Sequence, residues 1–204
     1  MVETKQRSKL ERFLPYLLIF VGVIGVIAAL VITQDKIKLL EDPNFKPSCS
    51  INPIISCGSV MKSAQSHVFG FPNTYIGLVG FPVLITTGVI LLGGARLKRW
   101  YWLGLNAGLL FGIGMVHWLF FQSVYRIHAL CPYCMAVWIV TITAFWYVTL
   151  YNIQAKNIKL PAKARPVAGF VRRHHLDILV LWFLIILALI LKHFWYYFGK
   201  HLPF

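Results

Sequence analysis

Charged side chains are scarce in this sequence, and acidic ones are the scarcest. Only 13% of the 204 residues are charged, six of them acidic, and the mean hydropathy is +0.70. An ordinary soluble domain has about a quarter charged residues, so this composition excludes that class. The chain also lacks an internal repeat and a low-complexity tract. A single domain in a lipid bilayer is therefore expected.

Long apolar runs are what the sequence does contain. Crossing a bilayer as a helix takes about 20 apolar residues. Five stretches qualify, roughly 13–33, 75–94, 100–125, 131–153 and 176–198. They predict an all-α, polytopic membrane domain over residues 1–204. The first stretch has no small-x-small cleavage site and four spans follow it, so we interpret it as a retained helix rather than a signal peptide.

The excess of basic residues, with a net charge of +14, could indicate nucleic-acid binding, so the location of the charges must decide. Most fall in three segments that share one side if every span crosses: Lys5, Arg7, Lys9, Arg12, Arg96, Lys98, Arg99, Lys156, Lys159, Lys163, Arg165, Arg172 and Arg173. The positive-inside rule makes that side cytoplasmic. The pattern predicts no nucleic acid, a cytoplasmic N-terminus, and an outward-facing loop at 34–72 and C-terminus.

The outward loop 34–72 is the longest polar segment. Val60, Ala64 and Val68 recur in it at i, i+4 and i+8, which predicts a short amphipathic helix on the membrane surface. It serves equally well as an interfacial anchor or as a lid over a cavity.

The small and polar residues in the third span are interpreted as helix-packing residues rather than as residues of a catalytic or binding site. Gly104, Gly108 and Gly112 share one helical face, where another helix is expected to approach closely. His117 lies inside this span and is a functional candidate by position. A hydrogen bond to a neighbouring helix is the favoured interpretation.

Cysteine is rare as well, with four in the chain, and all four fall on the outward side or at its membrane boundary. Disulfides form and persist in such compartments, so thiol–disulfide chemistry is favoured. Cys131-Pro132-Tyr133-Cys134 is a CxxC where the fourth span begins, and a helix N-terminus stabilises a thiolate. Zinc would have to combine this pair with Cys49 and Cys57, and purely structural disulfides are the other alternative. We predict no metal.

The combined spacing resembles the vitamin K epoxide reductase family. The similarity lies in Cys49-x7-Cys57, in Ser63 six residues later, in Asn73 at the start of the second span and in the CPYC motif, and it extends over roughly 13–153. The Phe69-Gly70-Phe71-Pro72-Asn73 run is more similar to the bacterial members, which support disulfide formation.

The resemblance implies a fold and a redox site. Spans one to four would form a four-helix bundle around a quinone of the menaquinone, ubiquinone or vitamin K type, with the fifth helix added. Cys131 and Cys134 would be the active pair, Cys134 facing the quinone, while Cys49 and Cys57 carry electrons from a partner. Ser63 and Asn73 match positions that line the quinone pocket, Asn73 placed to hydrogen-bond a quinone oxygen.

The resemblance also implies a partner and a location. Many bacterial relatives continue into a thioredoxin-like domain, so a separate thioredoxin-fold protein on the outer side is expected here. The bacterial inner membrane is favoured over the endoplasmic reticulum.

The expected function is a thiol oxidoreductase that reoxidises this partner and reduces quinone to quinol. One alternative is reduction of a vitamin K epoxide or quinone. Vertebrate members have Tyr where this chain has Trp138, whose indole donates but cannot accept a hydrogen bond, so we carry over no role for it. A further alternative is a non-enzymatic membrane protein with structural disulfides.

Overall fold

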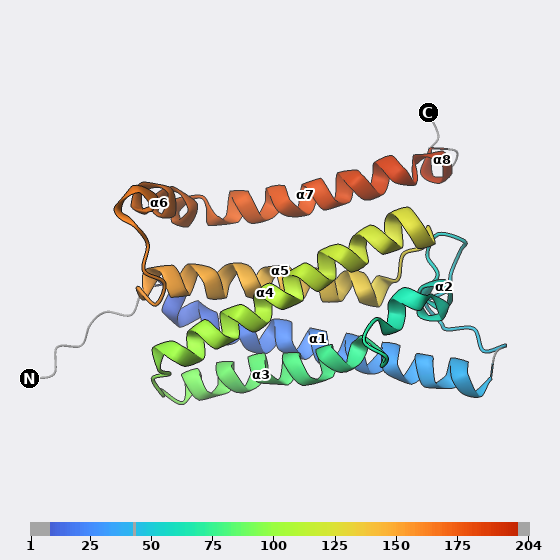
Figure 1. Ribbon diagram of the computed structural model, residues 1–204, viewed down its shortest axis with the longest axis horizontal. Coiled ribbons are helices and arrows are strands. Elements are labelled where there is room, and N and C mark those ends of the chain that lie inside the picture. The colour runs from blue at the N-terminus through green and yellow to red at the C-terminus, as the bar shows by residue number, and fades with distance from the viewer. Residues whose placement is uncertain (1–8, 43, 200–204) are drawn as a thin grey trace, which may run out of the picture.

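The structure is a computed structural model that describes residues 9–42 and 44–199, and in this part of the chain all regular elements are helical (Figure 1). Five helices are long and apolar enough to cross a membrane, which confirms the all-α polytopic prediction: α1 Lys9–Glu41, α3 Thr74–Leu92, α4 Arg99–Gln122, α5 Pro132–Gln154 and α7 His175–His193. The shorter elements are α2 Cys57–Lys62, η1 Ala64–His67, the π-helix η2 Ser123–Ile127, η3 Ala162–Ala164, α6 Arg165–Arg173 and α8 Trp195–Phe198.

The first helix is longer than its apolar stretch. Helix α1 continues to Glu41, so residues 34–41 are helical rather than irregular. No Gly or Pro interrupts this part of the sequence, and Pro43 follows it. The extension carries the chain beyond the apolar part of the bundle before the polar loop begins.

Four helices form the bundle. Helix α1 packs against α3 and α5, and α4 packs against α5 (Figure 1). Their buried apolar side chains form one cluster, with Leu18, Trp102, Ile142 and Val148 among its least exposed members. Helix α7 lies along the outside, and Trp182 attaches it by donating to His117 Nε2 at 3.0 Å. This contact confirms the packing interpretation of His117.

Glycines permit the close approach of α1 and α3. A Cβ atom at Gly88 would lie 2.6 Å from the carbonyl oxygen of Pro15, and one at Gly22 would lie 2.6 Å from Ile85. The packing prediction for the third span was wrong at Gly104 and Gly108, where nothing lies within 4 Å of an added Cβ. It was right at Gly112, where an added Cβ would lie 3.2 Å from the Thr141 side chain of α5. Helix α4 thus approaches α5 at Gly112 but not at Gly104 or Gly108, and helical spacing alone does not say which part of a face is covered.

The bundle has two chemically different ends. The cysteine end holds the redox loop, residues 44–57, together with α2, η1 and the start of α5 (Figure 1). The basic end holds the α3–α4 turn, the connector 155–164 and α6. Both η1 and α2 fall in the segment predicted to form a surface helix, which is broken at Ser63 into two short helices.

Candidate functional site

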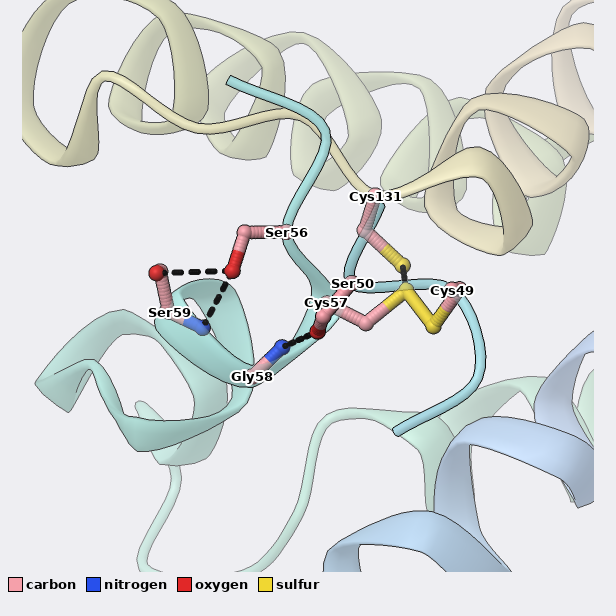
Figure 2. The surroundings of a disulfide bond; sticks show 7 residues. All are labelled: Cys49, Ser50, Ser56, Cys57, Gly58, Ser59 and Cys131. Atoms are coloured by element: carbon pink, nitrogen blue, oxygen red, sulfur yellow. Dashed lines mark hydrogen bonds between the residues drawn. A yellow bond between two sulfur atoms is a disulfide. The ribbon is translucent and has the colours of Figure 1, made fainter. Parts of the chain in front are cut away.

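The redox loop is closed on itself by a disulfide. Cys49 and Cys57 are bonded with their Cα atoms 5.6 Å apart, within the usual range. The Ser50 hydroxyl accepts a hydrogen bond from the backbone of Gly58 at 3.2 Å, and Ser56 caps α2 by accepting one from the backbone of Ser59 at 3.3 Å (Figure 2). Both contacts start α2 at Cys57, so the second cysteine sits on a defined helical turn.

A backbone bridge joins this loop to the chain ahead of the CPYC motif. Leu130 donates its N–H to the carbonyl of Ile54 at 2.7 Å, and Ser56 donates to the carbonyl of Leu130 at 2.9 Å. Asn52 supports the loop side of the bridge, because its side-chain oxygen accepts from the backbone of Ile54 and Ile55. Nothing in the sequence signals this two-stranded contact, which is too short to carry a strand pattern.

The bridge places three sulfurs together. Cys131 Sγ lies 3.1 Å from Cys57 Sγ, and the sulfurs of Cys49, Cys57 and Cys131 are all within 4.8 Å of one another (Figure 2). Cys57 and Cys131 have no exposed surface, and Cys49 is 6% exposed. Such a trio is also close enough to hold a metal ion, but the sulfurs of a disulfide are not the thiolates that metals bind. The oxidised pair therefore favours sulfur exchange over a metal site.

The surroundings of Cys131 lower the pKa of its thiol. It is the N-cap of α5, followed by Pro132 at the first helical position. The Cys134 thiol donates a hydrogen bond to it and is the main reason that the pKa of Cys131 is lowered, with backbone N–H groups of Tyr133 and Cys134 adding to the effect. Burial and the negative charge of Asp35 act in the opposite direction. The backbone N–H groups at the helix start thus contribute to the lowered pKa of Cys131, but the thiol of Cys134 contributes more.

Cys134 occupies the boundary between two apolar clusters. It lies in the first turn of α5, keeps some exposed surface, and carries a free thiol. Its side chain packs against the main bundle core and also against the cluster around the other three cysteines. The free thiol of Cys134 thus lies between the other cysteines and the apolar interior of the bundle.

Ser63 and Asn73 both lie beside η1, and both are half-buried. The Ser63 hydroxyl donates to the carbonyl of Val60 at 2.7 Å. Asn73 donates through Nδ2 to the carbonyl of Gln65 at 2.7 Å, and its side-chain oxygen accepts from the backbone of Val68 at 3.2 Å. Each retains spare capacity, since an amide NH₂ has two hydrogens and a hydroxyl oxygen can also accept.

Two residues on α1 belong to this neighbourhood although no sequence motif marks them. Lys36 donates to the carbonyl of Met61 and to the Ser66 hydroxyl, which ties α2 and η1 to α1. Asp35 is 9% exposed, and its Oδ2 has no hydrogen-bond partner within the part of the chain that the structure describes. Asp35 and Lys36 directly follow the apolar stretch 13–33. From sequence alone, charged residues at such a position are expected to face solvent at the membrane surface rather than to be buried.

Comparison with known proteins gives one family match. The sequence model of the Vitamin K epoxide reductase family matches residues 16–149, which run from the first turns of α1 to the last turns of α5 and include all four cysteines. No curated protein matches the chain.

Proposed function

The chain belongs to the vitamin K epoxide reductase family, and from this premise we propose that it reoxidises a separate thioredoxin-fold partner and passes the electrons to a membrane quinone. Membership makes it a membrane thiol oxidoreductase linked to quinone or vitamin K chemistry. The direction of electron flow, the partner and the roles of single cysteines are the proposal.

The observation that carries the proposal is the 3.1 Å separation of the Cys57 and Cys131 sulfurs. Thiol–disulfide exchange proceeds by attack of a thiolate on a disulfide sulfur through a mixed disulfide. At this distance the two pairs can exchange with little movement of either helix start. Structural disulfides would not require a low-pKa thiol in contact with them.

The first half of the relay oxidises the partner. A partner thiolate attacks Cys49, forming a partner–Cys49 bond and releasing Cys57 as a thiolate. The partner's second thiolate then attacks its own bonded sulfur, so the partner leaves with a disulfide and Cys49 leaves as a thiolate. The loop pair is now reduced by two electrons.

The second half moves these electrons inward. Cys57 attacks Cys131 of a Cys131–Cys134 disulfide, and Cys134 leaves as a thiolate. Cys49 then attacks Cys57, which restores the loop disulfide and releases Cys131. The resulting state, with Cys49–Cys57 bonded and two free thiols in the CPYC turn, is the arrangement in the structure.

The residues at the cysteine end fit a quinone. Cys134 is open to apolar surroundings, and the second amide hydrogen of Asn73 can donate to a carbonyl oxygen. Phe69, Phe71 and Tyr75, which flank Asn73 in the sequence, form a chain of ring contacts at about 6 Å. When bound, a quinone takes up two electrons and two protons, which returns Cys131 and Cys134 to the disulfide. A strongly oxidising partner at about −120 mV requires an acceptor of this kind.

The proposed orientation follows the charges. With the basic end in the cytoplasm, the cysteine end faces the outer compartment, where a disulfide-forming partner operates. The bacterial inner membrane is the proposed location.

Reconstitution tests the function. The full chain in proteoliposomes receives a reduced thioredoxin-fold disulfide-forming protein and ubiquinone or menaquinone, and quinol formation is followed with loss of partner thiols. We expect one quinol per partner disulfide, abolished by Cys134→Ala and retained by Thr143→Ala, a substitution on the same helix. Activity only with a vitamin K epoxide would favour the alternative reaction, and quinone-linked activity that survives loss of Cys134 would contradict the relay.

A further inference from the structure

A cleft of about 630 Å³ opens at the basic end, between the last turn of α5, the connector 155–164 and α6. Among the described residues that line it, none is acidic and four are cations: Lys156, Lys159, Arg165 and Arg172. Four positive charges around one cavity favour an anion strongly, because each adds to the same local potential. Helix α6 and the end of α5 lie at the opposite end of the bundle from α2 and the start of α5, which carry Cys57 and Cys134 (Figure 1).

Hydrogen bonds hold the connector beside this cleft in place. Asn152 is fully buried and donates to the carbonyl of Trp102 at 3.1 Å, and it accepts from the Asn157 side chain at 2.9 Å. Arg99 of α4 donates to the carbonyl of Asn157 at 2.8 Å. The connector is thus fixed to two helices of the bundle, α4 and α5.

Lys156 occupies an unusual backbone position for a lysine. It follows the C-terminus of α5 with φ of 56°, in the left-handed region where Gly or Asn is usual. A helix stop at this point does not require a long cationic side chain. The lysine nevertheless places its charge in the lining of the cleft.

The surroundings favour a lipid over a free anion. Ile153, Ile158 and Leu160 line the same cleft. Helix α6 is seen nearly end-on in Figure 1 while the spans run across the picture, so it lies crosswise at the end of the bundle. Its Val167 and Phe170, one turn apart, are 62% and 61% exposed. A crosswise helix with basic and apolar residues is typical of the membrane interface.

We propose that this cleft binds the phosphate headgroup of an anionic phospholipid, with the apolar side chains of α6 among the acyl chains. Basic pockets at the cytoplasmic ends of membrane helices take such headgroups. The lipid would hold α6 against the connector and the last turn of α5, and this role is independent of the thiol relay.

Native mass spectrometry of the full chain in a neutral detergent tests the proposal. The protein is titrated with phosphatidylglycerol, with phosphatidylcholine as a neutral-headgroup lipid, and with inorganic phosphate as the free ion. We expect phosphatidylglycerol to bind at least tenfold more tightly than phosphatidylcholine, and excess inorganic phosphate not to displace it. Arg165→Gln is expected to weaken binding roughly fivefold, since one cation near the surface is worth about that factor.

Two further variants separate charge from folding. Lys156→Gly removes a cation where glycine suits the backbone, so binding should fall while the unfolding temperature holds or rises. Lys163→Gln removes an exposed cation of the same connector outside the lining and should leave binding unchanged. Equal weakening by Lys163→Gln, or equal affinity for phosphatidylcholine, would overturn the cleft as the site. Displacement by inorganic phosphate at concentrations comparable to the lipid would overturn the lipid as its ligand.

Discussion

Ser56 donates its backbone N–H to the carbonyl of Leu130 at 2.9 Å. Ser56 directly precedes Cys57 and Leu130 directly precedes Cys131, and the sulfurs of these two cysteines lie 3.1 Å apart. The pairing of these two backbone segments therefore sets the position of Cys57 relative to Cys131. Because the register is fixed by the backbone, it should persist when the other two cysteines are removed.

This relationship predicts which mixed disulfide forms. A Cys49→Ala/Cys134→Ala protein retains Cys57 and Cys131 and should form their disulfide almost completely on mild oxidation. The matched Cys57→Ala/Cys131→Ala protein retains Cys49 and Cys134 and should stay largely reduced. Peptide mass spectrometry after alkylation of free thiols measures both. Equal crosslinking in the two proteins would mean that the loop moves freely and that the register does not direct exchange.

The contact of α1 with α3 predicts a stability difference between two glycines of one helix. Gly88→Ala places a Cβ 2.6 Å from the carbonyl oxygen of Pro15, so the helices must separate, at a cost of about 1–3 kcal/mol. Gly80→Ala meets nothing within 4 Å and should be neutral or stabilising, because alanine favours a helix by up to about 1 kcal/mol. Thermal unfolding in detergent compares them. A Gly88→Ala protein as stable as the Gly80→Ala protein would show that the two helices pack less closely.

The membrane fold could be predicted from the sequence because five apolar runs of about 20 residues are typical of membrane-spanning helices and rare in soluble domains. The CPYC motif likewise predicted a helix start, and Cys131 is the N-cap of α5. Which glycines pack against another helix was harder to predict. Gly104 and Gly22 both lie within apolar helices, and only the tertiary structure says which one is covered. The bridge at Leu130 and the burial of Asp35 also depend on contacts between residues far apart in the chain, which leave no local pattern.

The contacts of Asn73 predict that its substitution changes the KM for quinone but not the rate of thiol–disulfide exchange. If its spare amide hydrogen serves the quinone, Asn73→Ala should raise the KM for quinone up to roughly tenfold, the value of one hydrogen bond. Ser63→Ala should have a smaller effect, because its hydroxyl hydrogen is already donated to Val60. Exchange between the two cysteine pairs, followed by rapid mixing and acid quench, should keep its rate in both. A slower exchange with an unchanged KM would assign Asn73 to holding η1 alone.

The pKa of Cys131 predicts opposite shifts for two substitutions. The hydrogen bond from Cys134 is the largest cause of its lowered pKa, so Cys134→Ala should raise the pKa and move the midpoint of the alkylation rate to higher pH. The carboxylate of Asp35 opposes the Cys131 thiolate, so Asp35→Asn should lower the pKa and move that midpoint to lower pH. Asp42→Asn, at an exposed position near the end of α1, is the control and should leave it in place.

The measurement is iodoacetamide labelling of Cys131 from pH 5 to pH 10 with the loop disulfide intact, read by peptide mass spectrometry. Only the thiolate reacts, so the labelling rate follows the fraction of Cys131 that is ionised. A general loosening of the site would raise the labelling rate at every pH and leave the midpoint unchanged. Shifts of the midpoint in the same direction for both variants would contradict the assignment, because the thiol donor and the carboxylate act on the same sulfur with opposite sign.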